Sequence, residues 1–446
     1  MARKKTIGVR DRVEALLPRR ALNEMAREVG LCRRERKVRV APLFWALVLG
    51  FAGGRARSLA GLRRAYEEST GTRLAPSAFY DRFTPALVRL LKAVVGVLLA
   101  KVAAPRRALA GPLAAFRDLV LTDATVIRLH ALLAPAFPGC RTNHTKAALK
   151  LHAVMSATGA GPRSLKVTSE RVHDGPVFKV GPWVRDRLLL FDLGYFKFQL
   201  FSCIDRNGGF FIVRLKRSAN PTISALNRRW RGRSIPIVGQ RIWDFAARLR
   251  RQSLDAMVKV DFKRRVYGGV RHTATQQLRL VGILDPATRE YHFYLTNIPP
   301  NRLSPEDIGQ IYAARWVVEL FFRELKSHFR VEDMPSRKRH VVEALLYVAI
   351  IAFVVSRHLL AAVRKKLGAD ATLVPEERWA ILFARCGRDL LRLVLWPPRD
   401  AAPLARRLEP FLLHAALTPD HARAPLLARV ESRTQYYYRA TVGAHA

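Results

Sequence analysis

Residues 311–326 read IYAARWVVELFFRELK, a stretch in which polar residues recur at helical spacing among apolar ones. Four polar residues carry the pattern: Tyr312, Arg315, Glu319 and Lys326. Their offsets of 0, 3, 7 and 14 positions place them within an arc of roughly 60° on a helix that turns about 100° per residue. A solvated face with i, i+4 ion pairs is one interpretation. Since residues such as Trp316 make much of the remaining surface apolar, we expect the stripe to face a cleft.

A start signal for this helix lies a few residues upstream. Ser304 is an N-cap residue, Pro305 fits the first turn, and the carboxylates of Glu306 and Asp307 suit the positive end of the helix dipole. The sequence therefore predicts a long helix from Ser304 through the polar stripe. We expect the chain to be helical again after Val341.

Two aspartates stand in strongly apolar surroundings. Asp123 lies within LVLTDATVI (residues 119–127), and Asp192 ends LLLFD (residues 188–192). Burying a carboxylate in an apolar strand is costly unless its charge is compensated. A divalent metal ion would compensate it. The alternative, that each aspartate caps a turn at the end of its strand, stays open.

Short apolar runs bounded by Gly, Pro and polar residues predict strands in the middle of the chain. We expect strands at Leu119–Ile127, Ala147–Met155, Arg163–Thr168, Leu188–Asp192 and Phe210–Leu215, with a helix at Tyr195–Asp205. A hairpin turn is expected at Asp285-Pro286-Ala287-Thr288, between strands at Leu278–Leu284 and Tyr291–Leu295. The first hundred or so residues are predicted to form helices with basic connections.

The charge balance predicts a polyanionic partner. The 446 residues include 78 Lys and Arg against 35 Asp and Glu, a net charge of +43. Nucleic acid is the first candidate, because each neutralised phosphate releases a counterion. A membrane is disfavoured, because the longest apolar run, Ala344–Val355, has 12 residues and about 20 are needed to cross a bilayer. The four scattered cysteines and the charged N-terminal region favour a cytoplasmic protein.

The stripe has the pattern Y-x2-R-x3-E-x6-K, which resembles the signature of the IS-four family of bacterial insertion-sequence transposases. Further matches are Asp123-Ala124-Thr125 and Asp192-Leu193-Gly194-Tyr195, which are similar to the family's first and second aspartate motifs. Residues 295–299 and 76–83 also resemble family segments, and the resemblance covers residues from about 55 to 355. At position 193 many relatives carry a polar or small residue where this chain has leucine.

The resemblance implies an α/β fold with an RNase H-like core and a DDE triad of Asp123, Asp192 and Glu319. This triad would hold two Mg²⁺ ions, with Mn²⁺ able to substitute, for in-line phosphoryl transfer. The DNA-binding residues that it implies around the scissile bond are Tyr312, Arg315 and Lys326. Arg323, in the same stretch, is a further candidate for DNA binding.

The distance from Asp192 to Glu319, 127 positions, leaves room for the β-rich insertion that family members carry, here at about residues 221–296. Trp230 lies there among arginines, a mixture suited to DNA backbone and an unpaired base. In relatives that cut through a hairpin, an aromatic residue before the catalytic helix holds a flipped base. Tyr291, His292 and Tyr294 occupy that stretch, and ordinary strand packing is the alternative role.

We therefore expect three regions: residues 1–115, helical and DNA-binding; residues 116–355, catalytic, with the insertion; and residues 356–446, helical, for dimerisation or DNA contact. The expected function is a DNA transposase that binds terminal inverted repeats, cleaves donor DNA and transfers 3′ ends to target DNA. It would act as a homodimer in the bacterial cytoplasm, associated with the nucleoid. A structure-specific nuclease and a non-enzymatic DNA-binding protein derived from a transposase stay as alternatives.

Overall fold

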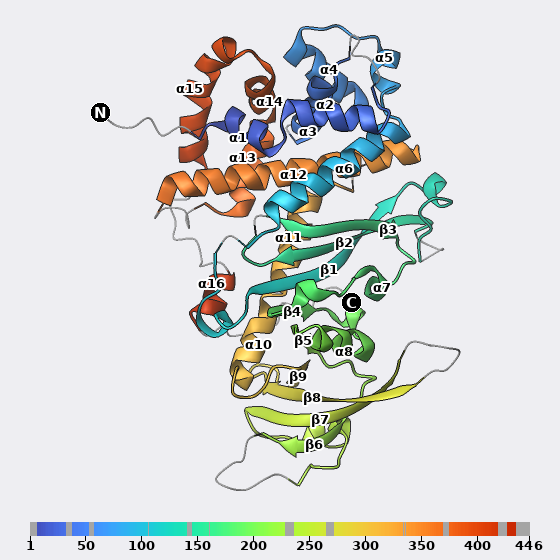
Figure 1. Cartoon of the computed structure of the whole chain (residues 1–446), viewed down its shortest axis with the longest axis vertical. Helices are drawn as coiled ribbons and strands as arrows, with labels where there is room; N and C mark the ends of the chain where they lie inside the picture. Colours follow the sequence, from blue (N-terminus) through green and yellow to red (C-terminus); the bar gives the residue numbers. More distant parts are fainter. Residues whose placement is uncertain are drawn as a thin grey trace.

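The computed structural model of the chain describes residues 7–32, 38–52, 58–105, 107–140, 145–159, 161–227, 236–264, 272–332, 334, 336–368, 374–417 and 426–433 (Figure 1). The α-helices are α1 (Val9–Leu16), α2 (Arg19–Glu28), α3 (Val40–Ala52), α4 (Leu59–Thr70), α5 (Pro76–Tyr80), α6 (Pro85–Val102), α7 (Asp174–Val177), α8 (Phe198–Arg206), α9 (Ile242–Phe245), α10 (Pro305–Ala313), α11 (Trp316–Ser327), α12 (Arg339–Leu367), α13 (Glu376–Arg385), α14 (Gly387–Leu395), α15 (Pro398–Ala415) and α16 (Leu426–Glu431). The strands are β1 (Asp118–Leu129), β2 (Ala147–Ser156), β3 (Pro162–Ser169), β4 (Arg187–Phe191), β5 (Phe210–Arg214), β6 (Thr222–Leu226), β7 (Ser253–Lys263), β8 (Thr273–Leu284) and β9 (Tyr291–Thr296). Short 3-10 helices are η1 (Gly111–Leu113), η2 (Ala131–Leu133), η3 (Pro182–Val184), η4 (Leu193–Tyr195) and η5 (Ala246–Arg248).

All the named strands belong to one sheet, in the order β3-β2-β1-β4-β5-β9-β8-β7-β6. Strands β1, β4 and β5 are parallel, and each of the other neighbouring pairs is antiparallel. The β-rich region expected at residues 221–296 therefore continues the central sheet, because β9 pairs with β5. The mixed α/β class with helical flanks is confirmed.

Side chains that alternate along the strands divide the core into two parts. Leu119 and Leu121 pack with residues of α6, α10, α11 and α12, such as Phe321. Val120 points the other way and packs with residues of α8 and α9, such as Phe201. The sheet is thus buried on both faces, and a residue's parity on β1 decides which face it reaches.

The N-terminal and C-terminal helices pack together beside the sheet (Figure 1). Helix α3 contacts α4, α12 and α14, and α12 also lies along α6. The buried carboxylate of Glu409 in α15 accepts hydrogen bonds from the backbone N–H groups of Ile7, Gly8 and Val9, at 2.8, 3.1 and 2.9 Å. These N–H groups open α1, where an anion is favoured. The boundary expected between residues 355 and 356 falls inside α12.

Helix α12 is long and apolar enough to cross a membrane by length and composition alone, with a mean hydropathy of 2.1 in its most apolar window. Of that window, 78% is buried inside the protein. Its apolar residues pack against α3, α6 and α11. Burial in the core of the helical region therefore accounts for this composition.

Candidate active site

Asp123 and Asp192 lie level with each other on neighbouring parallel strands. Thr122 of β1 is paired with Phe191 of β4, so that the next residue of each strand is an aspartate. Asp123 is two positions after Leu121, so both side chains are on the same face of β1, and Leu121 packs in the core that contains α10 and α11. Because successive side chains point to opposite faces, the carboxylate of Asp123 is directed to the face that carries α11.

The long helix expected from Ser304 is two helices. Ser304 forms a capping box with Asp307 at the start of α10, as its sequence suggested. At Ala314 and Arg315, however, backbone N–H groups bond to carbonyls three residues back, at 2.9 and 3.0 Å. This tighter turn separates α10 from α11 and changes the angular phase between them. The prediction of one continuous helix is wrong. Tyr312 is buried and Glu319 is half-buried.

Arg315 connects the acid on the sheet to the acid on the helix. Its Nη1 lies 3.6 Å from Oδ2 of Asp123, and its Nη2 donates to Oε1 of Glu319 at 2.5 Å. The side chain of Arg315 is 17% exposed, that of Asp123 19% and that of Glu319 30%. Residues 196 positions apart (319 − 123) thus face one guanidinium in a partly open site.

The electrostatics of Asp123 reflect this crowding. Burial, together with the negative charges of Asp192 and Glu319, raises the pKa of Asp123 to about 7. The N–H of Ala124, which donates to Oδ1 at 2.8 Å, and the guanidinium of Arg315 act in the opposite direction. The three acids are therefore close enough for their charges to repel one another, and an added cation would favour the ionised form.

A cavity of about 580 Å³ opens beside these acids. The residues that line it are Asp123, Ala124, Thr125, Glu319, Phe322, Arg323, Lys326, Ser327 and Glu332. Asp192 is outside this lining set among the described residues. Lys326 donates to the carbonyl of Val126 at 3.0 Å and lies 2.8 Å from Glu332, and Arg323 is exposed. The cleft is thus lined by the acids Asp123, Glu319 and Glu332 and by the cations Arg323 and Lys326 of α11.

Tyr312 is buried beside Arg315 and is outside the described lining of the cleft. Its hydroxyl donates to the carbonyl of Phe191, the residue before Asp192, at 3.1 Å. Its ring packs against Tyr294, with 5.1 Å between ring centroids. Burial raises the pKa of Tyr312 to about 12, so that the phenol stays protonated and can donate. In this state Tyr312 supports the end of β4.

The three candidates in the insertion have separate surroundings. Tyr291 donates from its hydroxyl to the carbonyl of Arg251 and stacks on Phe293. His292 lies 3.7 Å from Asp285, and burial lowers the pKa of its imidazole. Trp230 lies outside the described residues. Trp316 was expected to belong to the apolar surface of the helix, whereas it is 39% exposed at the start of α11.

The donor set fits a hard divalent cation, because carboxylate oxygens are the ligands that such ions prefer. Three acids act on one another electrostatically here, so that negative charge is in excess. Within the described part of the chain, no three His, Cys, Asp or Glu side chains form a ready metal cluster. Arg315 stands between Asp123 and Glu319 and supplies the compensating charge.

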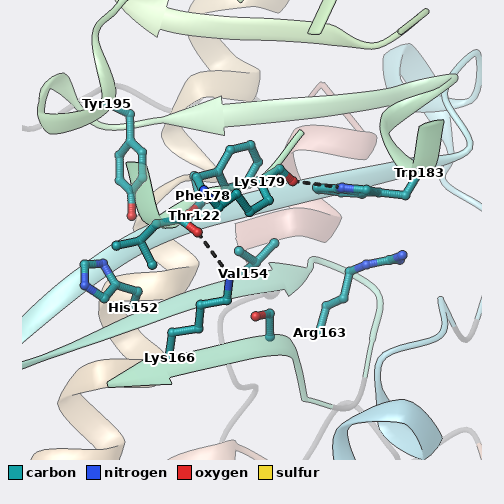
Figure 2. A pocket seen from close by; sticks show the side chains of 11 residues that line it. Thr122, His152, Val154, Arg163, Lys166, Phe178, Lys179, Trp183 and Tyr195 are labelled. Carbon is teal, nitrogen blue, oxygen red and sulfur yellow. Dashed lines mark hydrogen bonds between the residues drawn. The ribbon is translucent and has the colours of Figure 1, made fainter. Parts of the chain in front are cut away.

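A second cavity lies on the opposite face of the sheet (Figure 2). Thr122 and Tyr195, which flank the two aspartates in sequence, form part of its wall, together with basic residues of β3 and of the β3–β4 connection. This second cavity was not predicted from the sequence. The available signal was the density of Lys, Arg and aromatic residues between positions 163 and 183.

An acid within β1, an acid directly after β4, and an acid and cations on α11 are the side chains that a metal-dependent enzyme acting on DNA would use. A family model described as "Transposase DDE domain" matches residues 114–355, more than half of the chain. The chain belongs to this transposase DDE family and is a DNA transposase, a metal-dependent enzyme of DNA cleavage and strand transfer. Members of the family use divalent metal ions.

Two curated relatives are transposases from Bacillus thuringiensis. The chain is 22% identical over 397 residues to the transposase for insertion sequence element IS231B of subspecies berliner, with 78% of each chain covered. It is 24% identical over 390 residues to the transposase for insertion sequence element IS231F of subspecies israelensis, with 74% of this chain and 75% of the relative covered. The resemblance to insertion-sequence transposases is thereby confirmed.

Proposed function

We propose that Asp123, Asp192 and Glu319 form the DDE triad of an RNase H-like core. The support is the parallel set β1, β4 and β5 with β2 and β3 added antiparallel beside β1. Level aspartates within β1 and directly after β4, with a glutamate on a helix that contacts β1, are the arrangement such a core needs. The single observation that carries the proposal is the sharing of Arg315 by Asp123 and Glu319.

These three residues would hold two Mg²⁺ ions, or Mn²⁺ in their place. When bound, the ions would activate the attacking oxygen and stabilise the leaving oxygen of an in-line displacement. The chain's own contribution is orientation. Tyr312 holds the end of β4 through its hydrogen bond to the Phe191 carbonyl. The ion pairs with Arg315 hold the carboxylates of Asp123 and Glu319 near each other.

Arg315, Arg323 and Lys326 would hold the phosphates on either side of the scissile bond. Arg323 and Lys326 line the open cleft. Arg315 now pairs with two acids, and its guanidinium would be released for a phosphate once cations compensate those acids. A DNA-binding role for Tyr312, Trp230, Tyr291 and His292 is part of the same proposal, and for Tyr312, Tyr291 and His292 it requires that DNA rearrange their present contacts.

The biological reaction proposed is excision and insertion of a mobile element. The enzyme would bind terminal inverted repeats, cleave the donor and join the freed 3′ ends to a target in the bacterial nucleoid. Residues 1–115 would contact DNA, and residues 356–446 would serve dimerisation or DNA contact. Two ends must be held at once, which requires at least a homodimer in the active complex.

The decisive experiment is cleavage of duplexes that carry the element's own terminal repeats, with Mg²⁺, by the wild type and by Asp123→Ala, Asp192→Ala and Glu319→Ala. Each variant should bind the duplex normally and lose cleavage. Glu343→Gln, an acid-removing change on α12, is the matched control and should cleave normally. Full cleavage by any of the triad variants would refute the assignment of that residue.

The two alternatives make different predictions for the same reagents. A structure-specific nuclease would cut branched DNA and fail to join pre-cleaved 3′ ends to a target. A non-enzymatic derivative would bind the repeats without any Mg²⁺-dependent cut. The names of the relatives and the presence of all three acids favour transposition.

A further inference from the structure

The cavity behind the active site is basic. It has a volume of about 200 Å³ and is lined by Thr122, His152, Val154, Arg163, Ser164, Lys166, Val177, Phe178, Lys179, Trp183 and Tyr195. Three of these described lining residues are cations, and the set contains no carboxylate. Concave sites lined by charge of one sign concentrate ions of the opposite sign. The cavity is therefore suited to an anionic group.

None of the acids near the cavity is among its described lining residues, although the charge of Asp118 interacts with Arg163 and those of Asp123, Asp174 and Asp192 with Tyr195. Asp174 lies 3.1 Å from Lys150 and 3.5 Å from Nδ1 of His152, so that its charge is directed to β2. Lys166 donates to the neutral carbonyl of Val177 at 3.2 Å. Lys179 is exposed at the rim. Positive charge therefore stays in excess within the cavity.

The aromatic residues of the cavity pack on one another rather than present free ring faces. The guanidinium of Arg163 lies 4.8 Å from the centre of the Trp183 ring. Phe178 meets Trp183 edge-on at 5.8 Å, and the indole N–H donates to the carbonyl of Lys179 at 3.0 Å. A stacked nucleobase would have to displace Arg163. The ligand that suits the site is accordingly a phosphate group rather than a base.

The cavity lies close to the proposed catalytic acids but on the other face of the sheet. Thr122 directly precedes Asp123 and has the opposite parity on β1, and Tyr195 follows Asp192 by three positions (195 − 192). Figure 2 shows Tyr195 and Thr122 on one side of the cavity, with Arg163 and Lys166 on β3 across from them. The cleft with the cations of α11 and this basic cavity thus lie on opposite faces of β1, at adjacent residues of that strand.

We propose that this cavity binds a phosphodiester group of the DNA segment that lies beyond the scissile phosphate, opposite to the segment held by α11. The proposal rests on the proposed function and deepens it, because it gives the same active site a second DNA-holding surface. Two DNA segments have the required chemistry: the donor flank before cleavage and the target DNA after it. The experiment below separates them.

The variants are Lys179→Gln and Lys179→Glu at the exposed rim, and Lys166→Gln within the cavity. Lys179→Arg keeps the charge. Arg206→Gln is the matched control, because Arg206 is an exposed cation at the end of α8, where the parallel strands begin, on the edge of the sheet away from the aspartates. Circular dichroism melting of each protein verifies folding.

Binding is measured against salt concentration for three duplexes: an element end with its donor flank, the same end cut at the cleavage position, and a random-sequence target. Each lost phosphate contact lowers the slope of log K against log salt by about 0.9. Lys179→Gln should lower one slope by about this amount, Lys179→Glu should lower it more, and Lys179→Arg should leave it unchanged. A loss confined to the flanked duplex identifies the donor flank. A loss confined to the target, measured by capture on the pre-cleaved complex, identifies target DNA.

Unchanged slopes for all three duplexes with folded Lys179→Glu and Lys166→Gln would overturn the proposal. An equal loss with Arg206→Gln would also overturn it, because the effect would then be general charge removal. These readouts are binding measurements. Loss of cleavage in the triad variants with normal slopes therefore tests the proposed function separately.

Discussion

Two carboxylate–guanidinium contacts in this protein have the same chemistry and very different surroundings. In the insertion, Arg279 makes two hydrogen bonds to Asp255, at 2.8 and 2.7 Å, and donates to the carbonyl of Leu303 at 2.8 Å. Arg279 and Asp255 are 1% and 4% exposed. At the candidate active site, Arg315 is shared by Asp123 and Glu319 and opens to a cleft.

The comparison shows how the two roles can be distinguished. The Asp255–Arg279 pair is dry and bidentate, and Asn227 adds another donor at 2.8 Å. Nothing remains for a ligand to satisfy. Arg315 makes a longer contact to Asp123, whose pKa is raised by burial to about 7. The negative charges of the acids around Arg315 are only partly compensated, which is the condition expected where cations and DNA bind.

The largest expected effect is the loss of stability when the buried Asp255–Arg279 ion pair is broken. Arg279→Ala leaves Asp255 as a buried, unpaired charge, and the free energy of unfolding should fall by about 3–5 kcal/mol. Urea unfolding followed by circular dichroism measures it. The double variant Arg279→Met, Asp255→Leu should recover much of the loss, because no unpaired charge is left. A loss below about 1 kcal/mol for the single variant would show that this pair is not closed.

Removal of Arg315 at the candidate active site should affect cleavage much more than stability. Arg315→Ala should change the free energy of unfolding by less than about 1 kcal/mol, because water reaches both acids. Cleavage should fall by roughly 10- to 100-fold, which corresponds to the loss of a charge-assisted contact of about 1.5–3 kcal/mol. Arg315→Lys should recover only part of it, because an ammonium lacks the fork of a guanidinium. Severe destabilisation with normal cleavage per folded molecule would reverse the comparison.

A smaller effect on stability is expected at Glu324. This acid is intermediate between the fully hydrogen-bonded Asp255 and the partly compensated Asp123. It pairs with Arg357 of α12, yet its Oε1 has no hydrogen-bond partner among the described residues. Burial raises the pKa of Glu324 from 4.5 to about 7. Between these values the folded chain holds a proton that the unfolded chain has released, so that the free energy of unfolding falls as pH rises through this window.

The Glu324→Gln variant tests that pH dependence. The wild type should lose about 2–3 kcal/mol of unfolding free energy between pH 4.5 and 7 from this group, and Glu324→Gln should lack this part of the slope. Urea unfolding at several pH values gives the difference, with Glu343→Gln as the control. Identical pH profiles for the wild type and Glu324→Gln would show that Arg357 compensates the charge fully.

Much of the architecture could be predicted from local patterns. The apolar runs at residues 119–127 and 188–192 form strands, and Ser304 caps a helix, because strand alternation and capping are local properties. Pairing of β9 with β5 was not predictable, because it joins segments about 80 residues apart whose apolar patterns fit many partners. The contact of Glu409 with the first turn of α1 is equally long-range.

The candidate site was predictable in its residues and less so in its geometry. Asp123, Asp192, Glu319 and Lys326 were picked out by spacing and resemblance, and the structure brings Asp123, Glu319 and Lys326 to one cleft. The turn at Ala314 and Arg315 divides the predicted helix in two, while Tyr312 stays next to Arg315, with 6.0 Å between its ring centre and the guanidinium carbon. The pairing of Arg315 with two acids depends on three-dimensional proximity that helical spacing does not encode.

The central claim is that the three acids bind divalent metal ions together. Mn²⁺ binding to the complex of the protein with a pre-cleaved element end, measured by electron paramagnetic resonance, tests it directly. The wild type and the Glu343→Gln control should retain Mn²⁺, whereas Asp123→Ala, Asp192→Ala and Glu319→Ala should each lose it while still binding DNA. Equal Mn²⁺ binding by all five proteins would contradict the account.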